Sequence, residues 1–200
     1  MTNEIAKFAI ITICLIIAAS NKEYALNRRD SRLLTAGLLC TLVADLFLII
    51  LFVYPPGVVF FSAVQILYVL RFGGKRAVFV TPLVVIMPTI HVIFGGDMLV
   101  AFAIGYAQLF IIAYICMLFS IKRKVYPTPN RILVFTGMTL FMLCDICVAV
   151  WNLGRMGVIT NEAATRLALD AIWLFYAPSQ LCLALSGHKF AERGSSYGGN

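Results

Sequence analysis

Long apolar runs, separated by short polar or glycine- and proline-rich breaks, extend over nearly the whole chain. An α-helix needs about 20 mostly apolar residues to cross a bilayer, and seven runs approach or reach this length, at residues 5–20, 33–53, 57–72, 77–94, 98–120, 131–152 and 164–186. The first and third are the shortest and would cross with little tilt. The pattern predicts an all-α, polytopic transmembrane helix bundle of about seven spans.

The breaks between the runs have turn chemistry and are too short to form a soluble domain. They are rich in proline and glycine, as in Tyr54-Pro55-Pro56-Gly57, Gly73-Gly74, Gly95-Gly96-Asp97 and Tyr126-Pro127-Thr128-Pro129-Asn130. We therefore expect one transmembrane domain over residues 1–190. A short, polar, disordered cytoplasmic tail is expected at residues 191–200.

Composition supports a lipid environment. The chain is 62% hydrophobic and 12% charged, whereas soluble domains are about 45–50% apolar and about 25% charged. So few polar residues could not cover a water-facing surface of this size.

The basic residues predict the orientation of the bundle. If the spans alternate, one side receives 13 of the 16 Lys and Arg residues, and the other side receives only Lys7, Arg155 and Arg166. Cytoplasmic loops are enriched in Lys and Arg, so the N-terminus is expected outside and the C-terminus inside, in the plasma membrane. The net charge of +7 is scattered over short loops, which favours contact with lipid headgroups and argues against nucleic-acid binding.

The first apolar run has a second interpretation. Residues 8–19, ending near Ala18-Ala19-Ser20, also resemble the apolar part and cleavage site of a signal peptide. A signal peptide carries its positive charge before the apolar run, but here Lys22, Arg28 and Arg29 follow it. We therefore interpret the run as the first span.

The cysteines give little indication of metal or redox chemistry. All six lie inside predicted spans, where free thiols behave as small apolar side chains. Cys144 and Cys147 match C-x-x-C, but the motif has no second pair and no nearby histidine to complete four zinc ligands. We expect neither a metal ion nor an organic cofactor.

Acidic residues inside the apolar runs are the first candidates for function, because a charge at membrane depth is costly. Asp45 and Asp145 lie about equally far into two spans that run in the same direction, so their depths should differ by roughly 3 Å. No basic residue is predicted at this depth, and both are interpreted as functional, the alternative being a structural hydrogen bond. Asp170 lies nearer the outer interface, where we expect a structural pair with Arg166.

A short repeat surrounds the two acids. Gly37 precedes Asp45 by eight residues, and Gly137 precedes Asp145 by the same distance. Small residues allow neighbouring helices to approach closely, so each strip is expected to pack tightly while its aspartate faces the centre of the bundle.

Other polar side chains fall at similar depth. They serve either as hydrogen-bonding links between helices or as the lining of a polar pocket beside the two acids, and they are Gln65, Tyr68, Tyr106, Gln108, Tyr176, Ser179 and Gln180. Pro82, Pro88 and Pro178 should bend their helices and could open such a cavity.

Three of these segments resemble the YhhN-like membrane proteins, the lysoplasmalogenase family. Residues 38–45 are similar to its L-L-x-S-x-x-G-D strip, residues 137–145 to its G-x-x-L-F-x-x-S-D strip, and residues 176–180 to its Y-x-x-x-Q segment. The order runs through residues 35–186. Thr41 and Cys144 stand where the family usually has Ser, Ala44 where it has Gly and Gln65 where it has His, and family members have about eight spans.

The resemblance implies an ether hydrolase that cleaves the vinyl-ether bond of lysoplasmalogen, a lysophospholipid, into a fatty aldehyde and a glycerophospho-headgroup. Asp45 and Asp145 would be the catalytic acid and base, and Gln65, Tyr68, Tyr106, Tyr176 and Gln180 would contact the substrate. Two other classes stay open. Two acids at membrane depth and a parallel repeat are also typical of a small proton-coupled transporter, and a non-catalytic lipid-binding membrane protein is the third interpretation.

Overall fold

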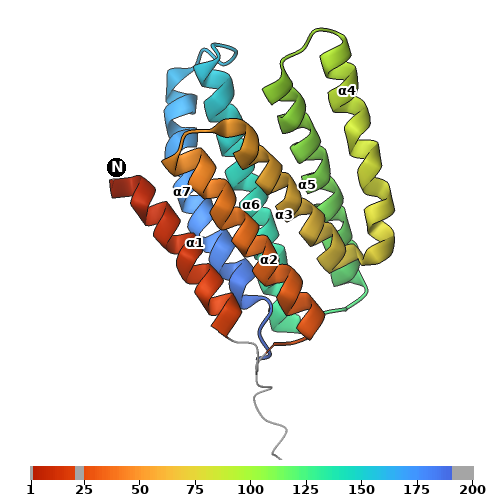
Figure 1. Cartoon of the computed structure of the whole chain (residues 1–200). Coiled ribbons are helices and arrows are strands. Elements are labelled where there is room, and N and C mark those ends of the chain that lie inside the picture. The colour runs from red at the N-terminus through yellow and green to blue at the C-terminus, as the bar shows by residue number, and fades with distance from the viewer. Residues whose placement is uncertain (1, 21–24, 191–200) are drawn as a thin grey trace, which may run out of the picture.

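The computed structural model describes residues 2–20 and 25–190 as helical rods that run alternately up and down (Figure 1). The elements are, in order, α1 (Thr2–Ser20), α2 (Arg28–Asp45), the π-helix η1 (Leu46–Ile50), α3 (Tyr54–Gly73), the 3-10 helix η2 (Lys75–Val85), α4 (Ile86–Ile93), α5 (Met98–Lys122), α6 (Thr128–Arg155) and α7 (Glu162–Leu185). The predicted all-α bundle is confirmed. The predicted tail at residues 191–200 lies outside the described residues.

The helices have the length and surface of a membrane bundle. Five are long and apolar enough to cross a membrane, namely α2 with η1, α3, α5, α6 and α7, while the apolar stretches Phe8–Ser20 and Pro82–Ile93 are shorter. Large apolar side chains point away from the bundle, and Phe79 and Phe94 are 84% and 86% exposed. Water would not favour such a surface, so the chain is an integral membrane protein.

Two helices differ from their predicted form. The third span was predicted to begin at residue 57, but it begins at Tyr54 and has 20 residues. Pro55 and Pro56 occupy its first turn, where a missing N–H costs nothing. The fourth is not one α-helix over residues 77–94. Its first part, η2, is a 3-10 helix that contains Pro82, which lacks the N–H for an α-helical hydrogen bond and disfavours α-helix at the preceding residue.

The packing order places α3 between α2 and α5, and α7 beside α6. Helix α1 covers α2 and α7, and α4 packs at the periphery against α5. Between the described parts of α2 and α6 there is no direct backbone contact. The centre is filled by fully buried side chains that include Leu38, Tyr68, Met138, Phe141 and Leu183.

The basic residues gather at one end of the bundle. The end of α1, the start of α2, the ends of α3, α5 and α7 and the start of α6 lie together at the bottom of Figure 1. We call this the basic end, and its described Lys and Arg residues include Arg28, Arg29, Arg32, Arg71, Lys75, Lys122, Arg123, Lys124, Arg131 and Lys189. A hydrogen bond of 2.9 Å from the Leu26 N–H to the Gly187 carbonyl connects the segment before α2 to the segment after α7.

Candidate functional site

Asp45 lies at the last residue of α2 and is 3% exposed. The Tyr176 hydroxyl, from α7, donates a short hydrogen bond to its carboxyl. The backbone changes to the π-helix η1 at the next residue, Leu46, and π-helical turns occur frequently at functional sites. The acid is thus fixed between α2 and α7 where the helix geometry changes.

Asp145 lies on α6 and is partly buried. The Tyr106 hydroxyl, from α5, donates a hydrogen bond of 2.5 Å to its Oδ2. The Gln65 side-chain amide, from α3, donates in turn to the Tyr106 hydroxyl at 3.4 Å. Phe61 and Phe110 contact the Tyr106 ring edge to face. Asp145 is therefore oriented by a chain of groups from three helices.

The two carboxyls belong to separate acid–phenol pairs that α7 brings into one region. Helix α7 packs against α6 over a long contact and also meets α2. We call Asp45, Tyr176, Asp145, Tyr106 and Gln65 the acid–phenol site.

On α3 and α7, three buried side chains have polar atoms with no hydrogen-bond partner among the described residues. They are Oε1 of Gln65, the hydroxyl of Tyr68 and Oε1 of Gln180, and all three residues are 0% exposed. A buried polar atom without a partner costs free energy, and such atoms are rare in folded proteins unless water or a ligand satisfies them. This arrangement suits a polar molecule bound among α3, α5 and α7.

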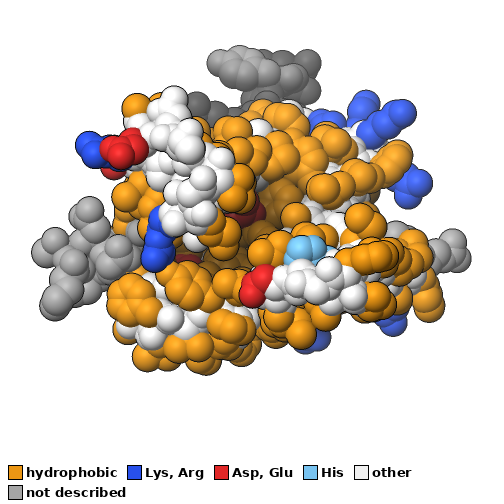
Figure 2. All heavy atoms as spheres, turned by 90° about the horizontal axis from the view of Figure 1, so that it is seen from above, with side chains coloured by type: hydrophobic (Ala, Val, Ile, Leu, Met, Phe, Trp, Pro, Cys, Tyr) orange, Lys and Arg blue, Asp and Glu red, His pale blue; other side chains and the backbone are white. Residues whose placement is uncertain are grey.

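The face opposite the basic end is hollowed near its centre, with acidic side chains below the rim (Figure 2). Arg155, in the last turn of α6, is exposed at this end, and its guanidinium lies 5.0 Å from the centre of the Trp151 ring. The guanidinium thus lies over a ring one turn earlier on the same helix. The hollow has acidic side chains at depth (Figure 2).

Comparison with known families gives one match. The sequence matches the YhhN family over residues 4–187. The chain belongs to the YhhN family. Comparisons with curated proteins and with solved structures give no match. The predicted resemblance is confirmed, and in this YhhN-family protein the matched region contains both acid–phenol pairs.

The two glycines of the repeat differ in this YhhN-family protein. A methyl group on Gly137 would lie 2.8 Å from Cγ and 3.1 Å from the backbone N of Leu183, whereas one on Gly37 would lie 3.5 Å from the Tyr68 ring. The close helix approach that the repeat predicts is confirmed at Gly137. At Gly37 the contact is of ordinary van der Waals length.

The expected pair between Asp170 and Arg166 is wrong. Arg166 forms an exposed ion pair of 3.3 Å with Glu162, one turn earlier, because an acid N-terminal to a base at i, i+4 is the favoured order on a helix. Asp170 is exposed on α7.

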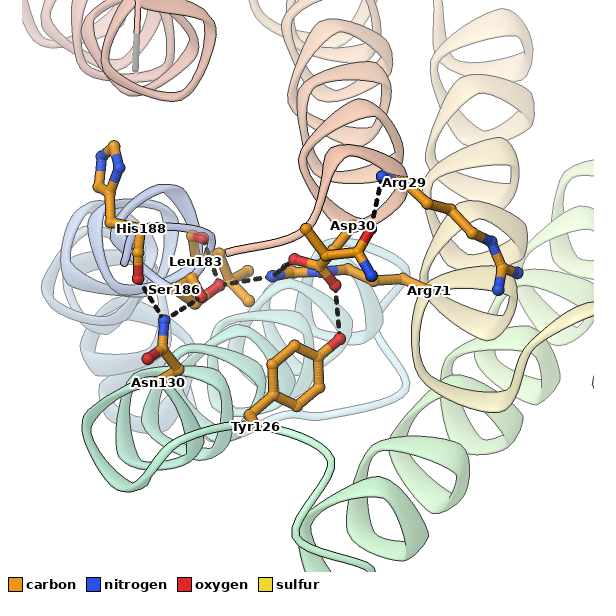
Figure 3. A network of polar contacts seen from close by, with 9 residues as sticks. Arg29, Asp30, Arg71, Tyr126, Asn130, Leu183, Ser186 and His188 are labelled. Carbon is orange, nitrogen blue, oxygen red and sulfur yellow. Dashed lines mark hydrogen bonds and ion pairs between the residues drawn. The ribbon is translucent and has the colours of Figure 1, made fainter. Parts of the chain in front are cut away.

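A second polar group, which the sequence did not predict, lies at the basic end (Figure 3). Arg71 binds both carboxylate oxygens of Asp30 at 2.9 Å and also donates to the Ser186 hydroxyl. The Tyr126 hydroxyl donates to Asp30 at 2.5 Å, and the Asn130 amide donates to the Ser186 carbonyl at 2.8 Å. We call these five residues the basic-end cluster. The available signal was Arg71, a charge inside the third apolar run.

Burial raises the pKa of the Tyr126 phenol, which precedes α6, well above its ordinary value. Asp30 acts in the same direction and Arg71 in the opposite one. The phenol therefore stays a hydrogen-bond donor to Asp30 across the physiological range.

The polar groups of the acid–phenol site in this YhhN-family protein are two carboxyls, two phenols and one amide. Among the described residues, no three His, Cys, Asp or Glu side chains are grouped as metal ligands. What the acid–phenol site offers is proton exchange through two carboxyls, hydrogen bonding through two phenols, and unpaired amide oxygens for a polar ligand.

Proposed function

We propose that this YhhN-family protein is an intramembrane hydrolase that cleaves the vinyl-ether bond of lysoplasmalogen. The observation that carries the proposal is the acid–phenol site, in which Asp45 and Asp145 each accept a hydrogen bond from a tyrosine, and Gln65, which contacts one of these tyrosines, has an unpaired amide oxygen. Acids at membrane depth are expensive and mark functional sites. The family resemblance supports the same reaction.

The proposed reaction needs one acid, one base and one water molecule. A carboxylic acid transfers its proton to the alkenyl carbon distant from the ether oxygen, and the carbon next to the oxygen becomes an oxocarbenium ion. The second carboxylate removes a proton from water as the water oxygen bonds to that carbon. The resulting hemiacetal breaks its bond to the glycerol oxygen, which takes up a proton, and leaves a fatty aldehyde and the glycerophospho-headgroup.

Two carboxyls in different surroundings can divide these roles, as acid and base pairs do in other enzymes. Asp45 is enclosed, whereas Asp145 is partly exposed. Tyr176 and Tyr106 hold the carboxyls in fixed orientations, and this matters because misplacement of a reacting group by about 1 Å can cost about 10²-fold in rate. Gln65, Tyr68 and Gln180 have polar atoms available for the glycerol oxygens.

The hollow supports a lipid with its headgroup toward the end opposite the basic end. Arg155 lies ten residues beyond Asp145 on α6, about 15 Å along the axis, and stacking on Trp151 shortens this separation. A phosphate a few bonds from the vinyl ether would then approach the guanidinium. Arg155→Gln should raise KM more than it lowers kcat, and it should not affect an alkenylglycerol that lacks phosphate.

The deciding experiment incubates purified protein in detergent with lysoplasmenyl-ethanolamine and follows fatty aldehyde. The ester-linked lysolipid and the Asp45→Asn/Asp145→Asn double variant serve as controls. Aldehyde from the vinyl ether alone, absent in the double variant, is the expected result. Absence of aldehyde from folded wild-type protein would overturn the proposal.

Transport is separated from hydrolysis by the same assay. A proton-coupled transporter needs a sealed compartment and a gradient, whereas a hydrolase forms product in detergent. Proton uptake by liposomes that contain the protein, together with no aldehyde formation, would favour the transporter. The Asp145–Tyr106–Gln65 contacts would then belong to a proton path.

A further inference from the structure

A cavity lies at the basic end, and none of the residues that line it belongs to the acid–phenol site. It has a volume of about 200 Å³ and is enclosed by the end of α3, the start of η2, the end of α5 and the segment that follows α5. Its lining includes Phe72, Ala77, Phe119, Ser120, Arg123 and Val125. We call this cavity the inner pocket.

The polar lining of the inner pocket contains an unused donor and a cation. Ser120 is 3% exposed, and its hydroxyl has no hydrogen-bond partner among the described residues. Arg123 is exposed at the mouth, flanked by exposed Lys122 and Lys124, and Lys75 follows the end of α3. The nearest buried acid, Asp30, is already neutralised by Arg71. The excess charge around the pocket is positive and suits an anion.

The rest of the lining is apolar and leads to the lipid-facing surface. Phe72, Ala77 and Val125 form the remaining wall, and Phe119 is 56% exposed on the outside of α5. A ligand that fits both parts has an anionic head and an apolar tail. At about 200 Å³ the pocket is smaller than the about 300–1,000 Å³ of sites that enclose a whole drug-sized molecule. It would hold a phosphate and part of a glycerol while acyl chains lie along α5.

We propose that the inner pocket binds the phosphate of an anionic glycerophospholipid from the membrane leaflet at the basic end, through Ser120 and Arg123. Basic pockets between transmembrane helices on the Lys- and Arg-rich side are suited to anionic headgroups. This site is separate from the acid–phenol site and does not depend on the proposed hydrolysis.

Binding at the inner pocket should also stabilise the basic-end cluster. The Phe72 ring, which lines the pocket, contacts Tyr126 edge to face at 6.4 Å, and the Arg71 guanidinium lies 5.2 Å from the Phe72 ring centre. A lipid that contacts Phe72 therefore restrains a neighbour of Arg71 and Tyr126. Since a ligand that binds only the folded state stabilises it, thermal unfolding reports occupancy.

The test measures retained lipid by native mass spectrometry and thermal unfolding in neutral detergent, with phosphatidylglycerol, phosphatidylcholine or inorganic phosphate added. Wild-type protein should bind phosphatidylglycerol and unfold at a higher temperature, with a weaker effect of phosphatidylcholine. The Ser120→Ala/Arg123→Gln variant should bind about tenfold more weakly, the effect of about 1.4 kcal/mol. Arg32→Gln removes an exposed charge from the same end outside the pocket and should bind normally.

Three results would overturn the proposal. Equal losses in the pocket variant and in Arg32→Gln would indicate general attraction to the basic surface. Unchanged binding in the pocket variant would exclude Ser120 and Arg123. Stabilisation by inorganic phosphate at the same concentration as the lipid would indicate a free-phosphate site. Each variant is first checked for wild-type helicity. Ser120→Ala alone, which keeps every charge, provides a second measurement and should also weaken phosphatidylglycerol binding.

Discussion

Two groups of polar side chains are buried in this bundle, and their aspartates have different partners. At the basic end, Asp30 accepts two hydrogen bonds from Arg71 and one from Tyr126. At the acid–phenol site, Asp145 accepts from Tyr106, a neutral phenol, and this phenol receives its own hydrogen bond from Gln65. The first carboxylate has a cation in contact, whereas the second is held by a neutral chain.

The difference indicates separate roles. A buried carboxylate with a bidentate arginine keeps its charge and links helices, and the basic-end cluster connects α2, α3, α6 and the segment after α7. A carboxyl held by a phenol can gain and lose a proton without breaking an ion pair. Gln65, which donates to this phenol, also has an amide oxygen without a hydrogen-bond partner among the described residues. The contacts at the basic end therefore suit a structural role, and those at the acid–phenol site suit the proposed chemistry.

The largest expected effect is on catalysis. Its absence would contradict the separate roles assigned to the aspartates of the basic end and of the acid–phenol site. Asp45→Asn and Asp145→Asn should each lower aldehyde formation by about 10²–10⁴-fold, the usual contribution of a general acid or base, with little change in unfolding temperature. Asp170→Asn is the matched control, since Asp170 is an exposed acid on α7 and its loss should leave the rate unchanged. Full activity in either site variant would exclude that carboxyl from the reaction.

The next effect concerns stability at the basic end. Arg71→Met leaves Asp30 buried without its cation and should lower the unfolding free energy by about 3–5 kcal/mol, as the loss of one partner of a buried ion pair does. The double variant Asp30→Leu/Arg71→Met should recover part of this loss because no lone charge stays buried. Equilibrium unfolding in detergent measures both. A single variant as stable as wild type would contradict the role given to the cluster.

The sequence predicted the helices and singled out the two aspartates at membrane depth, but it did not predict which side chains contact these aspartates. Run lengths and breaks predicted the helices, because the length of an apolar run and its proline and glycine boundaries are local properties. Asp45 and Asp145 were found because a charge in an apolar run is conspicuous. The partners Tyr176 and Tyr106 were predicted only as pocket lining, since neither sequence periodicity nor spacing says that α7 faces α2 or that α5 faces α6.

The basic-end cluster was missed for the same physical reason. Arg71 and Asp30 are 41 residues apart, and Arg71 and Ser186 are 115 apart, so their contact depends on how four segments meet at one end. In sequence, Asp30 lies among basic loop residues and Arg71 at the edge of an apolar run. Taken alone, each residue is equally consistent with an ordinary charge at the cytoplasmic end of a span, so the sequence does not indicate that the two residues pair.

A smaller effect tests whether Tyr126 belongs to the cluster. Tyr126→Phe removes a hydrogen bond to a charged acceptor and should lower the unfolding free energy by about 1.5–3 kcal/mol near pH 7. Because burial raises the pKa of the phenol, its protonated form is favoured by folding. That contribution is complete below the unfolded tyrosine pKa of about 10 and is lost as the pH rises above it, so the gap between wild type and variant should narrow in alkali. A constant gap up to pH 11 would contradict this account.

The smallest effect compares packing around the paired glycines. Gly137 lies against Leu183, whose carbonyl accepts from Ser186 of the basic-end cluster, while Gly37 lies against the Tyr68 ring. Gly137→Ala places a methyl group 2.8 Å from Leu183 Cγ, and overpacking of this kind costs about 1–3 kcal/mol. The gain in helix propensity of about 0.5–1 kcal/mol leaves a net loss of up to about 2.5 kcal/mol.

Gly37→Ala meets Tyr68 at an ordinary 3.5 Å, so the propensity gain should prevail and the variant should be neutral or slightly more stable. Thermal unfolding of the two alanine variants under identical detergent conditions gives the comparison directly. Equal destabilisation by both would mean that the region around Tyr68 is packed as tightly as the helix contact at Leu183.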